Sequence, residues 1–260
     1  MNEIAVISDI FLRKMTSIRA VGDLWLIHGF PESSLCFKEA FSILSDRYNV
    51  YAPDLPGFGV SPTLPHQDVE QVVDRLAQLI QTISSGRKIG ILGHSWGGIA
   101  AVKLAARLES VVQGYIDVEG SIIDWNFFFK PMALDPKTDP KGFAQFYVDK
   151  QRTFFDKSEV YGRYDASIRF ADADNFLPWA RSCLKAIDEG ALGLEFQALQ
   201  CPKTYFCGAR SAKYFPKEFL NQHQISYQTF EGCGHWPMVE SPDAFYKAAL
   251  EFFDMAFSAK

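Results

Sequence analysis

The stretch that decides the fold is residues 89–98, which reads Ile89-Gly90-Ile91-Leu92-Gly93-His94-Ser95-Trp96-Gly97-Gly98. The apolar run at its start is typical of a buried strand, and the small and apolar residues that follow, 99–108, indicate a helix. Between the two, the pattern Gly-x-Ser-x-Gly predicts a tight strand-to-helix turn that lifts the serine hydroxyl above the sheet. We therefore interpret Ser95 as a candidate nucleophile.

Outward from this turn, strand-like and helix-like segments alternate. The expected strands are 24–27, 49–52, 89–92, 113–118, 203–207 and 225–230. The expected helices are 35–48, 68–84, 99–108, 216–223 and 243–257. This alternation predicts an α/β fold with a mostly parallel central sheet flanked by helices, and sites in such folds lie at one edge, where the strands end.

One region interrupts the alternation. From Ser121 to about Gly193 the composition shifts to aromatic residues and Asp-Pro pairs, with helical patterns over 140–155 and 174–187. We expect residues 1–120 and 194–260 to form the core and residues 121–193 to form an inserted helical cap, or lid, over the site.

Composition bounds the possible partners. The 260 residues carry a net charge of −5, and the lysines and arginines are scattered, which argues against nucleic acid as a partner. There is no signal-peptide pattern at the start and no apolar run of the roughly 18 residues that cross a bilayer, so we expect a cytoplasmic protein that makes no membrane contact. Aromatic residues make up 15% of the chain, which fits either a large apolar cavity or simply more core.

The cysteines and the remaining motifs give no sign of a metal or cofactor. Five cysteines without paired spacing predict reduced thiols, and Cys233 is read as a small buried residue although it lies two residues before His235. No cluster has metal-ligand spacing and no glycine-rich phosphate loop is present, so no cofactor and no metal site is expected.

Three expected loops supply the parts that a serine nucleophile needs. A serine hydroxyl requires an adjacent base, which a carboxylate holds in one tautomer, and donors for the oxyanion that forms. His235 follows the last expected strand in a glycine-rich loop and is the candidate base. His28-Gly29-Phe30-Pro31 ends an earlier strand, and the backbone N–H groups of Phe30 and Trp96 are the expected oxyanion-hole donors.

These pieces together resemble the α/β-hydrolase superfamily over essentially the whole chain. The matching motifs are His28-Gly29-Phe30-Pro31 with Glu32-Ser33-Ser34, Asp54-Leu55-Pro56-Gly57-Phe58-Gly59, Gly93-His94-Ser95-Trp96-Gly97-Gly98 and Gly234-His235. The resemblance implies the α/β-hydrolase fold and a catalytic triad in the chain order Ser, acid, His.

The acid departs from the commonest family pattern. Members often place Asp after the strand that here is 203–207, but this chain reads Gly208-Ala209-Arg210-Ser211, with no carboxylate. The family's alternative places the acid one strand earlier, and this implies Glu119. Asp124 is the competing candidate, and Asp117 is disfavoured because it lies inside the expected strand.

Other polar residues in these motifs have simpler interpretations. Asp54 is expected to bind backbone N–H groups of its own turn. His28 is expected to order its loop, and His94 is expected to point away from the nucleophile and to fill a packing or hydrogen-bonding role.

The predicted activity is acyl transfer. The resemblance extends to dehalogenases and epoxide hydrolases, but those use an aspartate nucleophile, whereas a serine suits an ester, thioester, lactone or amide. We expect a cofactor-free serine hydrolase, of the carboxylesterase type, for a small and largely apolar substrate. Alternatives within the superfamily are a proline iminopeptidase and a C–C bond hydrolase. An alternative of another class is a non-catalytic or weakly catalytic ligand-binding receptor. The oligomeric state is left open.

Overall fold

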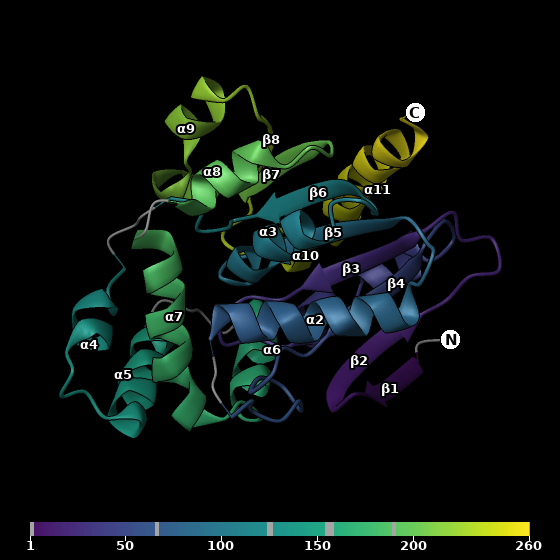
Figure 1. The fold of residues 1–260 in the computed structure, drawn as a ribbon. Helices are drawn as coiled ribbons and strands as arrows, with labels where there is room; N and C mark the ends of the chain where they lie inside the picture. Colours follow the sequence, from purple (N-terminus) through teal and green to yellow (C-terminus); the bar gives the residue numbers. More distant parts are fainter. Residues whose placement is uncertain (1–2, 66–67, 124–126, 154–158, 189–190, 260) are drawn as a thin grey trace.

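The computed structural model describes residues 3–65, 68–123, 127–153, 159–188 and 191–259. Its centre is an eight-stranded sheet in the order β1-β2-β4-β3-β5-β6-β7-β8 (Figure 1). The strands are β1 Glu3–Ile7, β2 Ile10–Met15, β3 Asp23–Ile27, β4 Asn49–Pro53, β5 Ile89–His94, β6 Val112–Val118, β7 Lys203–Gly208 and β8 Ser226–Phe230. β2 runs antiparallel to β1 and β4, and the other neighbouring strands pair in parallel.

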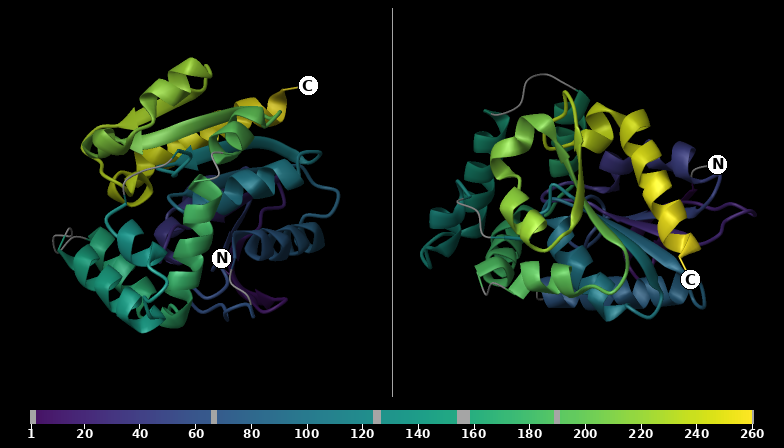
Figure 2. Two further views of the ribbon diagram at one scale, coloured as in Figure 1. Left: turned by 60° about the vertical axis from the view of Figure 1, so that its left-hand side comes forward. Right: turned by 90° about the horizontal axis from the view of Figure 1, so that it is seen from above.

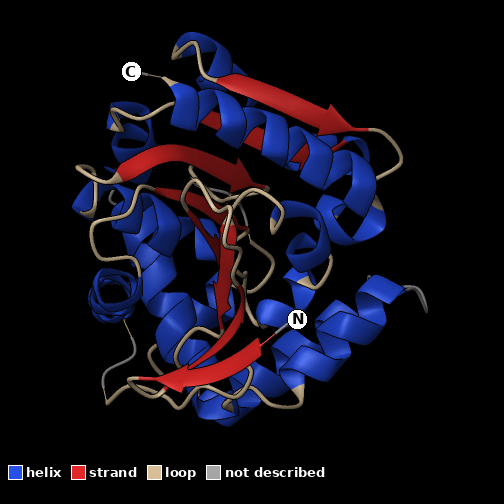
Figure 3. Ribbon diagram, turned by 90° about the vertical axis from the view of Figure 1, so that its right-hand side faces the viewer, coloured by secondary structure: helices blue, strands red, loops and turns tan. Residues whose placement is uncertain are grey.

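The central strands are apolar because they are covered on both faces. Every residue of β3 and β5 is buried, as expected for the middle of a parallel sheet. The edge strands differ: the first four residues of β8 are exposed, and β1 is mostly exposed. Successive strands turn relative to one another, so the sheet is strongly twisted (Figure 3).

Helices cover the two faces of the sheet. Helices α2 Val69–Ile83 and α3 Gly97–Arg107 pack together on one face, with α8 Ala191–Ala198 against α3. Helices α1 Ala40–Leu44 and α11 Pro242–Ser258 pack on the other, and the view from above separates the two layers (Figure 2). The shorter helices on the core are α9 Lys217–Gln222 and α10 Pro237–Glu240.

The segment between β6 and β7 carries a group of helices that lies beyond the carboxyl ends of the parallel strands (Figure 1). They are α4 Lys130–Leu134, α5 Pro140–Arg152, α6 Glu159–Ile168 and α7 Phe176–Asp188. α5 begins at Pro140 because Asp139 accepts a hydrogen bond from the N–H of Gly142 and caps it. A half-buried ion pair between Arg163 on α6 and Glu39 ties this group to the core.

One expected helix is broken. Residues 35–48 form a 3-10 turn over Ser34–Phe37 and the short helix α1, rather than one continuous helix. The start of this segment is held by the carboxylate of Asp54, which accepts from the N–H of Ser34 at 2.7 Å. Phe41 and Leu44 are meanwhile buried in the core on the α11 face. The chain turns between Ser34 and Phe41, and this turn allows both the hydrogen bond to Asp54 and the burial of Phe41 and Leu44.

Candidate active site

Ser95 lies in a strained turn between β5 and α3. Its φ is 51°, a left-handed conformation that costs a residue with a side chain roughly 1–2 kcal/mol. The turn is packed so closely that a Cβ on Gly97 would lie 2.0 Å from the carbonyl oxygen of His28. A Cβ on Gly93 would lie 2.5 Å from the Cβ of Ala101 on α3. The glycines of the motif are therefore required by contact with the neighbouring loop and helix.

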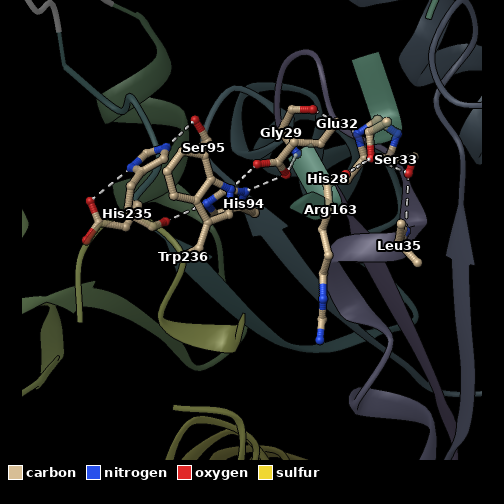
Figure 4. A network of polar contacts seen from close by, with 12 residues as sticks. His28, Gly29, Glu32, Ser33, Leu35, His94, Ser95, Arg163, His235 and Trp236 are labelled. Atoms are coloured by element: carbon tan, nitrogen blue, oxygen red, sulfur yellow. Dashed lines mark hydrogen bonds and ion pairs between the residues drawn. The ribbon is translucent and has the colours of Figure 1, made fainter. Parts of the chain in front are cut away.

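The structure brings three sequence-predicted side chains into one hydrogen-bonded chain. Nε2 of His235 lies 2.9 Å from Oγ of Ser95, and Nδ1 of His235 lies 3.3 Å from Oε2 of Glu119 (Figure 4 shows the first contact). The residues are 140 and 116 positions apart in the sequence. They meet because β5, β6 and β8 all end at the same edge of the sheet.

Glu119 follows β6 directly and is held from two sides. Its φ is 53°, its N–H donates to the carbonyl oxygen of Phe206, and its Oε1 accepts a 2.6 Å hydrogen bond from the N–H of Gly208. Its side chain is 4% exposed. One carboxylate oxygen thus contacts the imidazole of His235 and the other contacts the backbone at the end of β7.

Asp117 and Asp124 are the other two carboxylates considered as the partner of His235. Asp117 lies within β6 and accepts a hydrogen bond from the hydroxyl of Tyr115 at 2.9 Å, away from the His235 ring. Burial raises the pKa of Asp117 to about 7. Asp124 lies outside the residues that the structure describes.

Phe30 and Trp96 lie next to each other, one after β3 and the other at the start of α3. Their rings stack with centroids 5.6 Å apart. A Cβ on Gly29 would lie 2.9 Å from the Cβ of Ser95, so this loop lies against the nucleophile turn. In the described part of the chain, the backbone N–H groups of Phe30 and Trp96 donate to no acceptor.

An aromatic cluster from the inserted segment packs on these two rings. Phe127 and Phe129 contact the ring of Trp96, with centroids 5.2 and 5.0 Å away. Tyr147 on α5 and Phe176 on α7 contact the ring of Phe30 at 4.7 and 5.2 Å. The neighbourhood of Ser95 on the side of the inserted helices is therefore apolar and aromatic.

A second polar network lies behind Ser95. The carboxylate of Glu32 lies 3.0 Å from Nδ1 of His94, and it accepts hydrogen bonds from the N–H of Gly29 at 3.2 Å and from the indole N–H of Trp236. Nε2 of His94 donates to the carbonyl oxygen of His235 at 2.8 Å (Figure 4). This network connects the loops that carry Phe30, Ser95 and His235.

Charge sets the pKa values of the pair at its centre. Burial alone would raise the pKa of Glu32, but the charge and hydrogen bond of His94 outweigh burial and lower it to about 2. Burial would lower the pKa of His94, and here the charge and hydrogen bond of Glu32 outweigh burial and raise it.

Arg210 occupies the loop where many members of the superfamily carry the acid. Its guanidinium lies 2.6 Å from Oε1 of Glu240, whose Oε2 accepts from the N–H of Gly234 at 2.5 Å. The N–H of Arg210 donates to the carbonyl oxygen of Cys233. The residues around this position hold the backbone just before His235.

Two further residues match their sequence interpretation. Asp54 accepts from the N–H groups of Ser34 and Val60, at 2.7 and 3.0 Å. His28 accepts at Nε2 from the N–H of Leu55, at 2.8 Å, and contacts the carbonyl oxygen of Gly29 through Nδ1. Both residues order loops at the sheet edge, as the sequence analysis expects.

Sequence reasoning missed the contacts that Glu32, Gly208 and Glu240 make at the site. A carboxylate two residues after Phe30, inside the matching motif, was an available signal for Glu32. No local pattern marks the other two, because Gly208 acts through its backbone and Glu240 reaches Gly234 across a loop.

Within the described residues, no helix is long and apolar enough to cross a membrane. In the same part of the chain, no group of three or more His, Cys, Asp or Glu side chains is arranged to hold a metal ion.

Comparison with known proteins defines the class. Residues 26–248 match the model of the alpha/beta hydrolase family, so the chain belongs to that family and is an enzyme of the hydrolase type.

Three individual relatives share less than a third of their residues with this chain over the matched regions. A pimeloyl-[acyl-carrier protein] methyl ester esterase of Chromobacterium violaceum is 27% identical over 244 residues, which cover 85% of this chain and 83% of that protein. The match to an uncharacterized hydrolase of Saccharomyces cerevisiae is local: it is 29% identical over 98 residues and covers 37% of this chain and 33% of that one. The solved structure of a thermophilic esterase from Thermogutta terrifontis, 23% identical, aligns with a TM-score of 0.77 over 99% of this chain and 100% of that one.

Proposed function

We propose that this protein is a serine ester hydrolase with a triad of Ser95, His235 and Glu119. The observation that carries the proposal is the continuous hydrogen-bonded chain from Oγ of Ser95 through the imidazole of His235 to Glu119. A serine hydroxyl next to an imidazole whose other nitrogen faces a carboxylate is the arrangement that activates oxygen for attack on an acyl carbon.

The reaction proceeds in two steps. Oγ of Ser95 attacks the ester carbonyl as its proton passes to Nε2 of His235, and the same proton then goes to the departing alcohol. Water next attacks the acyl-serine and gives a proton to His235, which returns it to Ser95 when the carboxylic acid leaves. Throughout, Glu119 holds Nδ1 protonated and stabilises the imidazolium.

The backbone N–H groups of Phe30 and Trp96 serve as the oxyanion hole in this proposal. Neither N–H group donates a hydrogen bond within the described chain, so both are free to bind the oxyanion. Both belong to loops that lie against Ser95. Donors of this type contribute roughly 3–4 kcal/mol each to transition-state stabilisation.

The substrate is proposed to be a small ester with an apolar acyl or aryl group. The aromatic side chains of Phe127, Phe129, Tyr147 and Phe176 lie on the rings of Phe30 and Trp96, beside the nucleophile. Residues 121–193, which contribute four of these six rings, are proposed to act as a cap over the core of residues 1–120 and 194–260. The esterase named among the relatives supports ester chemistry.

The test combines turnover with active-site labelling. Purified protein is incubated with p-nitrophenyl acetate and butyrate and, separately, with a fluorophosphonate probe, with Ser95→Ala as the matched control. We expect hydrolysis of both esters and a single adduct on Ser95, and loss of both in the Ala variant. Absence of hydrolysis and of adduct in the unmodified protein would refute the proposal and would favour a ligand-binding receptor.

A further inference from the structure

The network behind Ser95 contains a histidine and a carboxylate that the proposed mechanism does not use. His94 ends β5 and is fully buried, and Glu32 follows the loop of Phe30 and is 3% exposed. Figure 4 shows the two side chains directed toward each other between the loops that carry Gly29 and Trp236. Burying two ionisable groups is costly unless each has a complete set of partners.

The hydrogen-bond partners determine where the protons lie. The carbonyl oxygen of His235 can only accept, so Nε2 of His94 carries a proton. Glu32 receives the N–H groups of Gly29 and Trp236. A carboxylate surrounded by these donors is an acceptor, so Nδ1 of His94 carries a proton as well.

We propose that His94 is a buried imidazolium paired with the carboxylate of Glu32, and that this ion pair is a positioning device for the catalytic loops. The catalytic part of this inference rests on the proposed function. The structural part, the protonation of both ring nitrogens, stands independently of any activity.

The pKa values of the pair agree with this assignment. The raised pKa of His94 and the pKa of Glu32 near 2 both favour the charged forms at neutral pH. A neutral His94 would have only one ring proton for its two acceptors, and either Glu32 or the carbonyl oxygen of His235 would lose a hydrogen bond.

The ion pair connects three loops that are distant in the sequence. Glu32 binds the oxyanion loop through the N–H of Gly29 and the histidine loop through Trp236, while His94 is the residue directly before Ser95. The bond from Nε2 of His94 to the carbonyl oxygen of His235 fixes the backbone from which the base projects. The oxyanion loop, Ser95 and His235 are thus all connected to one buried pair of side chains.

The ring of His94 also lies beside the ring of His235. The centroids of the two rings are 4.9 Å apart. The pair therefore lies next to the base as well as behind the nucleophile.

Other ionisable groups also face the pair, and none of them is substituted in Glu32→Gln. Those that interact electrostatically with Glu32 or His94, or line the small cavity beside Glu32, are His28, Cys36, Asp117, Glu119, Tyr147, Arg163, Tyr164 and His235.

The first test measures protonation in the unmodified protein. With five histidines in the chain, the ring nitrogens can be resolved by ¹H–¹⁵N correlation NMR on histidine-labelled protein, and His94 is assigned by the signals missing in His94→Gln. We expect both ring nitrogens of His94 in the protonated range at pH 7. One protonated and one unprotonated nitrogen would overturn the ion pair, whether or not the protein hydrolyses esters.

The second test measures the effect on turnover. Glu32→Gln keeps the shape but removes the carboxylate, so His94 loses the negative charge that holds its second proton. We expect kcat on p-nitrophenyl butyrate to fall about 10- to 100-fold, as misplacement of a catalytic group does, with KM changed less than about threefold.

Two further variants make the result specific. Trp236→Phe removes one donor to Glu32 and is expected to lower kcat only a few-fold. Ser33→Ala is the control in the same loop: it removes the contact between Ser33 and Ser167 at 2.7 Å but touches neither charge, and kcat and KM are expected to be unchanged.

The outcomes separate this inference from the proposed function. A Glu32→Gln variant with unchanged kcat and KM would refute the positioning role, even if NMR shows an imidazolium. If Glu32→Gln does not fold, the NMR result on the unmodified protein decides the ion pair, and Trp236→Phe against Ser33→Ala decides the positioning role. If the unmodified protein does not hydrolyse esters, the proposed function fails, and the positioning role with it, while NMR still decides the ion pair.

Discussion

The ends of β6 and β7 lie side by side at the sheet edge but carry opposite kinds of group. The strands pair in parallel, with Val118 opposite Phe206. β6 continues into Glu119, a buried carboxylate, whereas β7 ends at Gly208, which offers only its backbone N–H. The carboxylate of the first accepts a hydrogen bond from the second.

The position of the proposed triad acid is therefore set by which carboxylate reaches His235 rather than by strand number. Both strand ends lie beside the loop of His235: Glu119 contacts its imidazole, and Arg210 contacts the backbone at Cys233. A buried carboxylate needs donors, and here it finds the imidazole and the N–H of Gly208. The strand end without the acid supports the strand end that has it.

The largest expected effect comes from Glu119→Gln. The amide keeps the size of the side chain but no longer holds His235 in the tautomer that can accept the proton of Ser95. We expect kcat to fall about 10³- to 10⁴-fold, measured with p-nitrophenyl butyrate. Glu231→Gln, an exposed carboxylate four residues before His235, is the control and is expected to retain near-normal turnover. A Glu119→Gln variant with more than a tenth of normal kcat would contradict the assignment.

An intermediate effect, on stability rather than rate, is expected from Asp117→Asn. Buried Asp117 has a pKa of about 7, raised from an ordinary value of 3.8. Between these values the folded protein binds the proton and the unfolded chain does not, so the free energy of unfolding falls as pH rises from about 4 to 7. Asparagine does not titrate, so this loss, roughly 2–4 kcal/mol, is expected to be absent from the variant.

Urea unfolding at pH 5 and pH 8 gives the change in the free energy of unfolding between the two pH values. This change is compared between the unmodified protein and Asp117→Asn. The unmodified protein is expected to lose stability, relative to Asp117→Asn, between the two pH values. Asp243→Asn, an exposed aspartate in the first turn of α11, controls for the loss of one charge. Parallel pH dependences of the unmodified protein and Asp117→Asn would show that Asp117 is charged in the folded chain.

The smallest effect is expected from Arg210→Ala. The Arg210 side chain is 64% exposed, and exposed ion pairs contribute roughly 0–1 kcal/mol. Glu240 keeps its bond to the N–H of Gly234 in the variant. We expect kcat to change less than about threefold and the activity at high salt to match that of the unmodified protein. A loss comparable to that of Glu119→Gln would mean that the end of β7 contributes more than backbone support.

Much of the fold could be predicted from local pattern. The apolar runs of β3, β4 and β5 and the helical spacing of α2 are strong signals, because burial on both faces or on one stripe leaves a period in the sequence. The expected helix over 35–48 was wrong in one respect, since the chain turns to satisfy Asp54 at its start and the core at its end. Such a turn depends on partners that are distant in the sequence.

The site divides in a similar way. The motifs around Ser95, Phe30 and His235 are local, because a strained turn and a glycine-rich loop each need particular residues at particular spacings. Glu119 was selected by chain order and by the absence of a carboxylate after β7, with Asp124 as the competitor. Its contact with His235 depends on the pairing of β6 with β7, which no local pattern encodes.

The sequence by itself determined the class of fold, the strained serine turn and the loops that end on one sheet edge, because these follow from hydrophobic period and glycine placement. Only the tertiary structure decided which groups meet there. Hydrogen bonds between residues more than a hundred positions apart, such as His94 to His235 and Glu119 to His235, arise from strand order and leave no trace in sequence spacing. The proposed ion pair of Glu32 and His94, which are 62 positions apart, likewise depends on the fold, since each charge is tolerated only where folding supplies the other.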